Sequence, residues 1–260
     1  MREIIEDRAR KDAEEMLRFL EELKADEGDD WRAKIEARIN ELKSGIEATR
    51  DMGPVETGGI QSFSEEFRVD TARLMLRRPM EEDKDAFLAV KERYSFFKRT
   101  FQHDELRDEL WSEHLSHETL YCSIVHRATG EYIGYCGIKN LHKDIWEIAI
   151  ELKEEHCGQG FGYEAVTGFI EKATEALGPH EYCSRVEPEN VASQKLMEKL
   201  GFQPSGISEF FLHDEEEKRE AEEKYAYKLD GRYIELAKRF HTSPEKLISH
   251  VLEYRGVFGA

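Results

Sequence analysis

The residues best suited to chemistry form a glycine-rich turn between an expected strand and an expected helix. Residues 158–162 read Gly-Gln-Gly-Phe-Gly, follow a strand-like stretch at 145–152, and precede apolar side chains that recur at helical spacing. Backbone N–H groups converge at a helix N-terminus, and glycines let an anion approach them closely. The pattern therefore predicts an anion site suited to a pyrophosphate.

Several interpretations of this turn compete. A Walker A loop would need a Gly-Lys-Ser/Thr ending, which the turn lacks. A dinucleotide fingerprint would need G-x-G-x-x-G on a parallel βαβ unit, whereas Tyr163 and Glu164 follow at once. Dinucleotide-binding units also have an acidic residue that binds the cofactor ribose, and Glu187, after the next expected strand, could have that role. A glycine turn without any ligand is a further alternative.

The surrounding pattern predicts alternating short strands and helices from residue 73 to residue 229. Strands are expected at 73–78, 120–125, 132–139, 145–152, 182–187, 206–212 and 225–229. Helices are expected at 81–97, 104–117, 161–177 and 190–200. The acidic stretch 213–224 is expected to be a solvated loop or a helix extension.

Helical arms are predicted on both sides of this region. Residues 1–52 carry two apolar stripes and predict a helical hairpin, followed by a linker at 53–69. Residues 231–260 predict a helical tail of two short amphipathic helices, with Ser243 capping the second and Pro244 at its first position. Uncovered apolar stripes favour packing on the next domain or a homodimer.

Composition limits the classes of partner. The chain has 260 residues and a net charge of -18, which argues against nucleic acid and suits a cationic substrate. We expect a soluble, cytoplasmic protein without a membrane segment, because no apolar run approaches the ~20 residues that span a bilayer. The four cysteines have no C-x-x-C spacing, so we expect neither a metal site nor disulfides.

Several sequence blocks together resemble the GNAT superfamily of N-acetyltransferases, and most closely the branch of the ribosomal-protein alanine N-acetyltransferases. The blocks occur in family order and cover about residues 70–230. They are Thr71-Ala72-Arg73-Leu74-Met75-Leu76-Arg77, Trp146-Glu147-Ile148, residues 157–165 and residues 190–202. The resemblance implies an α+β fold with a mixed, mostly antiparallel sheet flanked by helices.

The resemblance also implies acetyl-CoA as co-substrate and a set of residues that bind it. The pyrophosphate is expected on backbone N–H groups of the glycine turn, and pantetheine beside the strand that ends at Leu152. The implied cofactor-binding residues are Ile150, Leu152, Cys157, Gly158, Gln159, Gly160, Phe161, Gly162, Tyr163, Asn190 and Ser193. Asn190 is equally suited to cap the helix that follows it.

Two positions depart from the family pattern. Cys157 stands where relatives usually have Arg or Gln, which removes one polar contact but leaves the backbone groups of the turn. Met197 stands where many relatives have a Tyr that acts as general acid. The loss is tolerable, because the leaving thiolate belongs to a thiol of pKa ~8.5. Ser193 could instead donate a hydrogen bond to the departing sulfur.

The catalytic expectation centres on two carboxylates of the strand 145–152. Glu147 is the first candidate for the general base that deprotonates the substrate ammonium, with its pKa raised by partial burial. Glu151 is the second candidate, four residues on and on the same face. Backbone N–H groups of the strand are expected to stabilise the oxyanion.

These residues predict transfer of acetyl from acetyl-CoA to a primary amine, either a protein N-terminus or a small amine. An alternative is a sensor that binds acyl-CoA without turnover. The departures from the family pattern at Cys157 and Met197 suggest it. A third hypothesis is an interaction protein that acts through its helical arms.

Overall fold

The structure is a computed structural model that describes residues 67–95, 101–116, 118–141, 143–209 and 215–259. The expected hairpin at 1–52 and most of the expected linker at 53–69 lie outside these residues. The described chain falls into two compact units. One holds a β-sheet with its flanking helices, and the other holds the helical segments Glu209–Ala237 and Ser243–His250.

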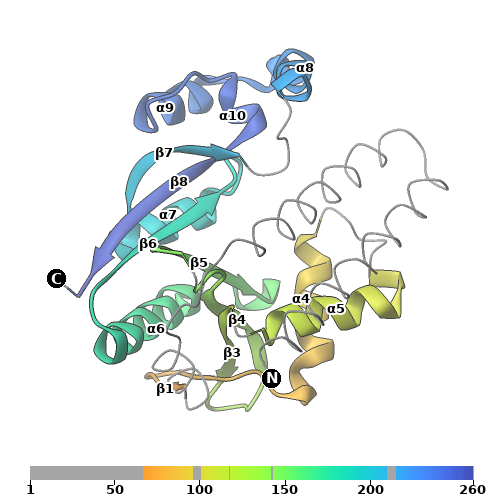
Figure 1. Cartoon of the computed structure of the whole chain (residues 1–260), viewed down its shortest axis with the longest axis vertical. Helices are drawn as coiled ribbons and strands as arrows, with labels where there is room; N and C mark the ends of the chain where they lie inside the picture. Colours follow the sequence, from red (N-terminus) through yellow and green to blue (C-terminus); the bar gives the residue numbers. More distant parts are fainter. Residues whose placement is uncertain (1–66, 96–100, 117, 142, 210–214, 260) are drawn as a thin grey trace, which may run out of the picture. The chain divides into compact units, whose positions relative to one another are not determined.

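The sheet has eight strands in the order β1-β2-β3-β4-β5-β6-β8-β7 (Figure 1). The strands are β1 Arg68–Asp70, β2 Leu74–Arg77, β3 Leu120–His126, β4 Tyr132–Ile138, β5 Ile145–Leu152, β6 His180–Val186, β7 Gln203–Glu209 and β8 His250–Phe258. Successive strands from β1 to β5 pair antiparallel, as does β6 with β8, whereas β5 and β6 run parallel. The expected mixed, mostly antiparallel sheet is therefore confirmed.

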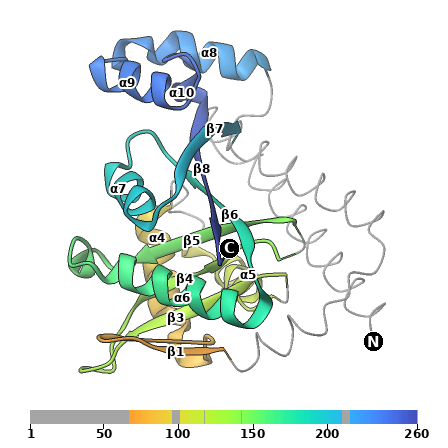
Figure 2. The same ribbon diagram turned by 90° about the vertical axis from the view of Figure 1, so that its left-hand side faces the viewer.

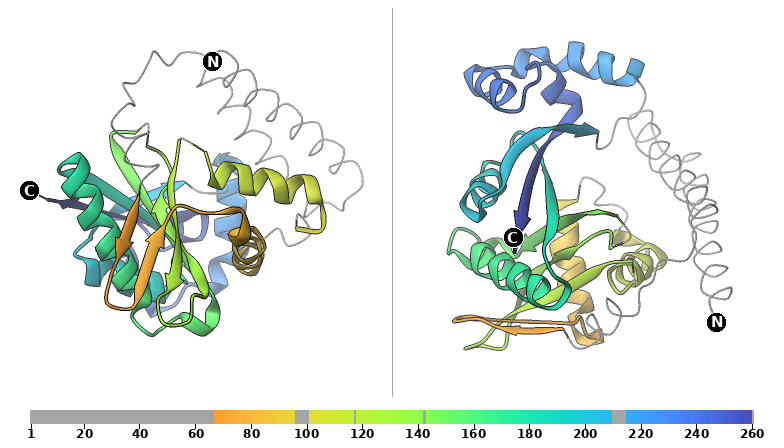
Figure 3. Two further views of the ribbon diagram at one scale, coloured as in Figure 1. Left: turned by 90° about the horizontal axis from the view of Figure 1, so that it is seen from below. Right: turned by 60° about the vertical axis from the view of Figure 1, so that its left-hand side comes forward.

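Helices cover both faces of this sheet. The 3₁₀ turn η1 Glu81–Asp83 leads into α4 Lys84–Tyr94, which lies with α5 Asp104–His114 against one face (Figure 3). The long helix α6 Phe161–Leu177 covers the opposite face, and α7 Val191–Leu200 follows β6 (Figure 2). Gly178 ends α6 at a φ of 85°, with its N–H donating to the Thr174 carbonyl at 2.9 Å.

The core lies between the sheet and these helices. On α6 the buried residues repeat at helical spacing, which is why this segment folds as an amphipathic helix on the sheet. They are Phe161, Ala165, Val166, Phe169, Ile170 and Ala173. Under α4 and α5 an aromatic cluster forms the other half of the core. Its buried members are Phe87, Leu88, Val90, Phe101, Trp111, Tyr132 and Tyr135.

The last part of the chain differs from the prediction. The strand expected at 225–229 is wrong, because α8 Glu215–Tyr225 and the 3₁₀ turn η4 Ala226–Lys228 occupy it. The tail contains α9 Gly231–Arg239 and α10 Lys246–Ser249, but its remainder is β8. Val251, Leu252 and Tyr254 fit a strand as well as a helix, and pairing with β6 decides between them.

The helices between β7 and β8 have polar contacts of their own. Lys218, with 1% of its side chain exposed, is ion-paired with Glu215 and Glu209. The Ser249 hydroxyl donates to the Glu222 carboxylate at 2.5 Å, which ties α10 to α8. The described part of the acidic stretch, residues 215–224, is helical. Among the residues that the structure describes, no helix has the length and apolar character needed to cross a bilayer.

Candidate active site

The glycine turn lies where the sequence predicts it, between β5 and α6. A 3₁₀ turn, η3 Glu154–His156, precedes it, and Cys157 to Gly160 are exposed. Gly158 has a φ of 71° and Gly160, the N-cap of α6, a φ of 82°. Residues with a Cβ rarely adopt this region, so the backbone requires glycine at both positions. The first N–H groups of α6 have no partner within the helix and are available to an anion.

A groove of about 850 Å³ adjoins the turn and follows α6. Gly160, Tyr163 and Arg73 line the end nearest the turn, and Lys199 of α7 also lines it. The Lys199 ammonium lies 4.2 Å from the centroid of the Tyr163 ring. The groove lies on the side of α6 that faces Arg73 and Thr71.

Beside the turn, β5 and β6 separate. Their parallel pairing is confined to Ile145–Glu147 against Glu181–Cys183, whereas β6 pairs with β8 along its whole length. The Lys139 N–H donates to the Glu147 carbonyl at 2.9 Å, which fixes the alternation of hydrogen bonds between β4 and β5. Main-chain groups of Ile150 and Leu152 therefore point away from β4, toward the gap. An extended ligand can pair with β5 along this edge.

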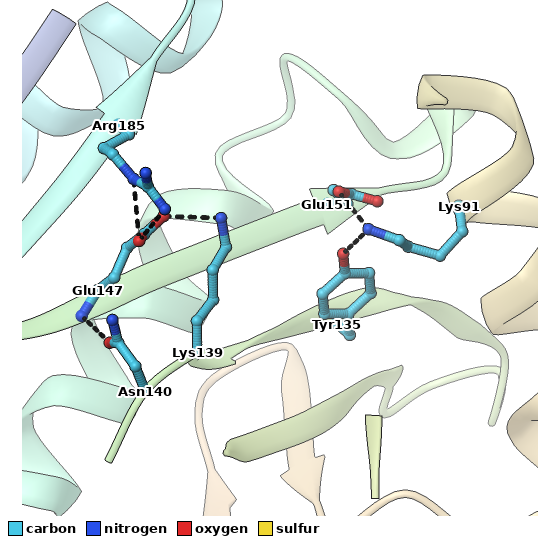
Figure 4. Close-up of polar contacts among 7 residues, drawn as sticks. All are labelled: Lys91, Tyr135, Lys139, Asn140, Glu147, Glu151 and Arg185. Carbon is cyan, nitrogen blue, oxygen red and sulfur yellow. Dashed lines mark hydrogen bonds and ion pairs between the residues drawn. The ribbon is translucent and has the colours of Figure 1, made fainter. Parts of the chain in front are cut away.

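Glu147 is a buried ion-pair centre (Figure 4). One carboxylate oxygen accepts from the Lys139 ammonium at 2.7 Å, and the other accepts from Arg185 Nη2 at 2.7 Å and Nε at 3.0 Å. Burial alone would raise the pKa of Glu147, but Lys139 and Arg185 outweigh it and lower this pKa. The expectation of a raised pKa is wrong, because two cations face the carboxylate.

Glu151 lies at the other end of β5 and has different neighbours (Figure 4). Its Oε1 accepts from the Lys91 ammonium of α4 at 3.2 Å, and Lys91 also donates to the Tyr135 hydroxyl at 3.2 Å. Its Oε2 is buried and has no hydrogen-bond partner among the described residues. Glu151 therefore has one ion-pair partner, where Glu147 has two.

The start of α7 holds two further predicted residues. The Asn190 side chain accepts a hydrogen bond from the Ser193 N–H at 3.0 Å, so Asn190 caps the helix as its residue type allows. Ser193 is half-buried. Met197, at the position of the general acid in many relatives, is 1% exposed and belongs to the core. This position supplies no proton donor.

Cys157 lies near the end of α4. The Tyr94 hydroxyl donates to the Leu152 carbonyl at 2.8 Å and lies 3.7 Å from the Cys157 sulfur. Burial and the neighbouring Cys157 raise the pKa of Tyr94 to about 12. The first position of the turn therefore has a phenol as its neighbour, and the prediction from sequence missed Tyr94.

Arg73 is a second residue that the prediction missed. Its guanidinium reaches from the start of β2 to the Gln159 carbonyl of the turn, with Nη1 at 3.1 Å. Its Nε donates to the Glu164 carboxylate of α6 at 2.7 Å. The sequence block around Arg73 was noted for its family pattern, but no local spacing connects it to residues about ninety positions later.

The same region bears on two other kinds of site, a dinucleotide-binding site and a metal site. Glu187, which follows β6, is half-buried, and burial together with Glu189 raises its pKa. β5 pairs parallel with β6 through α6, as a dinucleotide-binding unit requires, but it pairs antiparallel with β4, and Tyr163 stands where the fingerprint needs its third glycine. Glu131, Glu155 and His156 form a group with metal-ligand atoms, but the Lys153 ammonium already bonds Glu131 at 2.9 Å.

Comparison with known proteins gives a consistent picture. Residues 73–203 match the acetyltransferase (GNAT) domain. The uncharacterized N-acetyltransferase p20 of Bacillus licheniformis is 37% identical over 87 residues, which are 33% of this chain and 49% of that protein. The uncharacterized N-acetyltransferase YoaA of Bacillus subtilis is 32% identical over 93 residues, or 35% of this chain and 52% of that protein. The chain spans about half the length of these curated relatives.

Solved structures share the fold at low sequence identity. RimJ of Mycobacterium smegmatis, in complex with CoA-disulfide, is 15% identical, with a TM-score of 0.52 over 75% of this chain and 89% of that one. A ribosomal-protein alanine acetyltransferase of Vibrio fischeri is 14% identical, with a TM-score of 0.50 over 74% of this chain and 97% of that one.

Proposed function

Because the chain belongs to the GNAT acetyltransferase family, we propose that it transfers acetyl from acetyl-CoA to a primary amine. One observation carries the proposal. The exposed turn at the start of α6 is connected by the short η3 turn to the strand whose main-chain edge opens beside β6. An anion site and an open strand edge on one continuous segment suit a long cofactor with a diphosphate at one end. The acceptor is a protein N-terminus or a small amine.

The residues present fit acetyl-CoA. In this proposal, N–H groups from Gly158 to Tyr163 bind the diphosphate, and the main-chain groups of Ile150 with the Leu152 N–H pair with pantetheine like an added strand. Cys157 contributes its backbone to the turn in place of the usual Arg or Gln. The CoA-disulfide complex of the RimJ neighbour supports the same ligand class for this fold.

We assign the general base to Glu151 rather than Glu147. The Glu147 carboxylate is held by two cations and has a lowered pKa, so it is a poor acceptor for the ammonium proton. Glu151 has one cation and a buried oxygen without a partner in the described chain. It takes the proton directly or through a water, and the free amine attacks the thioester carbonyl.

The remaining steps need little from side chains. The oxyanion that forms is stabilised by main-chain N–H groups at the open edge of β5. The leaving thiolate has a conjugate thiol of pKa ~8.5 and leaves without strong acid assistance. Ser193 donates a hydrogen bond to the departing sulfur, which partly replaces the donor that Met197 cannot supply.

The test compares Glu151→Gln with Glu147→Gln, two isosteric changes on one strand. Acetyl-CoA binding is measured by calorimetry, and thiol release is followed with a panel of peptide N-termini and small amines. We expect Glu151→Gln to retain binding and to lose roughly 10²–10⁴-fold in kcat. Glu147→Gln should mainly lower the thermal midpoint, because it leaves Lys139 and Arg185 without their full partner.

The opposite pattern would reject the base assignment. If Glu147→Gln folds, binds and fails to turn over while Glu151→Gln turns over normally, Glu147 is the base. If the wild type does not bind acetyl-CoA, the proposed function itself is wrong.

A second candidate function is acyl-CoA binding without turnover. The buried Met197 at the general-acid position favours it. It predicts acetyl-CoA binding in calorimetry and no amine-dependent thiol release across the whole panel.

A further inference from the structure

Arg73 holds the glycine turn from outside. Its guanidinium bonds the Gln159 carbonyl at 3.1 Å and lies 4.3 Å from the centroid of the Phe161 ring. A Cβ added at Gly160 would lie 3.5 Å from Arg73 Nη2. The Arg73 side chain, just before β2, thus contacts Gln159 and Phe161 on either side of Gly160, where α6 begins.

Glu164 fixes the direction of this guanidinium. Its carboxylate accepts from Arg73 Nε at 2.7 Å, from the Arg73 N–H at 2.7 Å and from the Thr71 hydroxyl at 2.6 Å. Burial would raise the pKa of Glu164, but these bonds and the Arg73 charge lower it. The carboxylate stays charged, and the guanidinium keeps one orientation toward the turn.

The contact with the Gln159 carbonyl determines where the next N–H points. A trans peptide is planar, so its C=O and N–H point in opposite directions. With the Gln159 carbonyl directed at Arg73, the Gly160 N–H is directed away from Arg73. Glycine tolerates both signs of φ, so the Gln159–Gly160 peptide could otherwise rotate and present its carbonyl oxygen to an anion.

We propose that Arg73 is a positioning residue for the cofactor diphosphate, which it serves by locking the Gln159–Gly160 peptide with the N–H outward. The proposal rests on the proposed binding of acetyl-CoA at the turn. Arg73 acts from behind the turn, whereas the Arg or Gln usual at the position of Cys157 would act from within it. The hydrogen bond from Arg73 to the Gln159 carbonyl thereby maintains the anion site, although the turn begins with Cys157 rather than Arg or Gln.

The experiment measures binding of three ligands by calorimetry and competition. CoA and 3′-dephospho-CoA both carry the diphosphate, and pantetheine does not. The variant is Arg73→Gln. Its matched control is Arg127→Gln, which removes an exposed arginine that donates to the Thr71 carbonyl at 2.6 Å without reaching the turn.

We expect Arg73→Gln to weaken CoA and 3′-dephospho-CoA about tenfold each, as loss of a charge-assisted hydrogen bond does. Pantetheine binding should not change, and Arg127→Gln should bind all three ligands like the wild type. Arg73→Lys should fall between, because an ammonium cannot bond the carbonyl and Glu164 in the fork geometry of a guanidinium. If Arg73→Gln does not fold, Arg73→Lys provides the comparison.

Three results would overturn the proposal. Unchanged CoA binding in Arg73→Gln would remove the positioning role. A loss confined to CoA would assign Arg73 to the 3′-phosphate, and an equal loss for pantetheine would mean general damage. Failure of the wild type to bind CoA would reject the proposed function instead, so the two failures are distinct.

Discussion

At the scale of single residues, Gly160 combines a backbone constraint with a binding role. Its φ of 82° is costly for any residue with a Cβ, and its N–H faces the proposed diphosphate. Gly130, in the hairpin between β3 and β4, has a similar φ of 72° and open space around it. Comparing substitutions at Gly130 and Gly160 therefore separates the loss of folding stability caused by backbone strain from the loss of acetyl-CoA affinity caused by a distorted turn.

We predict that Gly160→Ala and Gly130→Ala each lose about 1 kcal/mol of stability, because both place a Cβ at a left-handed φ. Gly160→Ala should also weaken acetyl-CoA binding, whereas Gly130→Ala should not. Urea unfolding and calorimetry provide the two measurements. Equal acetyl-CoA affinity in the two variants would show that the turn does not bind the diphosphate.

His114 is a buried imidazole within the aromatic cluster. It is 3% exposed and lies between Phe87 at 4.0 Å and Tyr121 at 4.7 Å, measured between ring centroids. Its Nε2 has no hydrogen-bond partner in the described part of the chain. Burial, with the nearby charges of Lys91 and Arg78, lowers the pKa of His114 to about 3.

This pKa predicts a loss of stability in mild acid. The unfolded chain binds a proton at His114 below pH ~6.5, whereas the folded chain does so only near pH 3. Between these values each pH unit downward should cost about 1.4 kcal/mol. His114→Phe should remove this slope. Urea unfolding from pH 7 to pH 4 is the measurement, and parallel curves for variant and wild type would contradict the assignment.

The site could be predicted only where its signal is local. Glycines before an amphipathic helix mark the turn, and carboxylates four residues apart mark β5, so both were found from sequence. The roles of Glu147 and Glu151 depend on Lys139, Arg185 and Lys91, which come from three other elements. Spacing along the chain does not reveal which cation meets which carboxylate.

At the scale of elements, Asp83 connects three of them. Its carboxylate accepts from Arg77 of β2 at 2.6 Å, from the Ser123 hydroxyl of β3 at 2.6 Å and from the Met80 N–H before η1 at 2.9 Å. Burial would raise the pKa of Asp83, but these hydrogen bonds outweigh it and lower the pKa. Asp83 therefore fixes the start of α4 against the sheet.

We predict that Asp83→Asn lowers the free energy of unfolding at pH 7 by about 3 kcal/mol, because it leaves Arg77 with a neutral partner. The folded pKa is depressed, so the wild-type advantage exists above the unfolded pKa of ~3.9 and disappears as pH falls through the lower folded value. Chemical unfolding at a series of pH values from 7 downward tests both statements, because the difference should narrow as pH falls below ~3.9. A difference that persists in acid would contradict the charge argument.

Elements whose apolar residues repeat regularly along the sequence were predicted well. Elements whose structure depends on pairing with a distant strand were not. The prediction for β5 is confirmed at both ends, and α6 and α7 are confirmed with their glycine stops. The strand at 225–229 failed because Tyr225, Tyr227 and Leu229 alternate like a strand in a segment that folds as helix and turn. β8 was missed because its pairing partner β6 is distant in sequence.

At the scale of the molecule, the family expected from the sequence over 70–230 is confirmed by the match over 73–203. The fold extends beyond that match, since β8 completes the sheet after the helices α8 to α10. The hairpin at 1–52, the homodimer and the cationic acceptor stay predictions. Within the described site, Glu147 is paired with two cations and Glu151 with one.

The position of β8 has a consequence for how the protein is made. A ribosome synthesises β6, β7 and the helices α7 to α10 before it reaches β8, yet β8 lies between β6 and β7 in the sheet. Until then, neighbouring edges of β6 and β7 are without their strand and open to other chains. Nascent chains that stop within α8 to α10 should aggregate or be degraded. The sheet is therefore completed only after α8 to α10 have been synthesised.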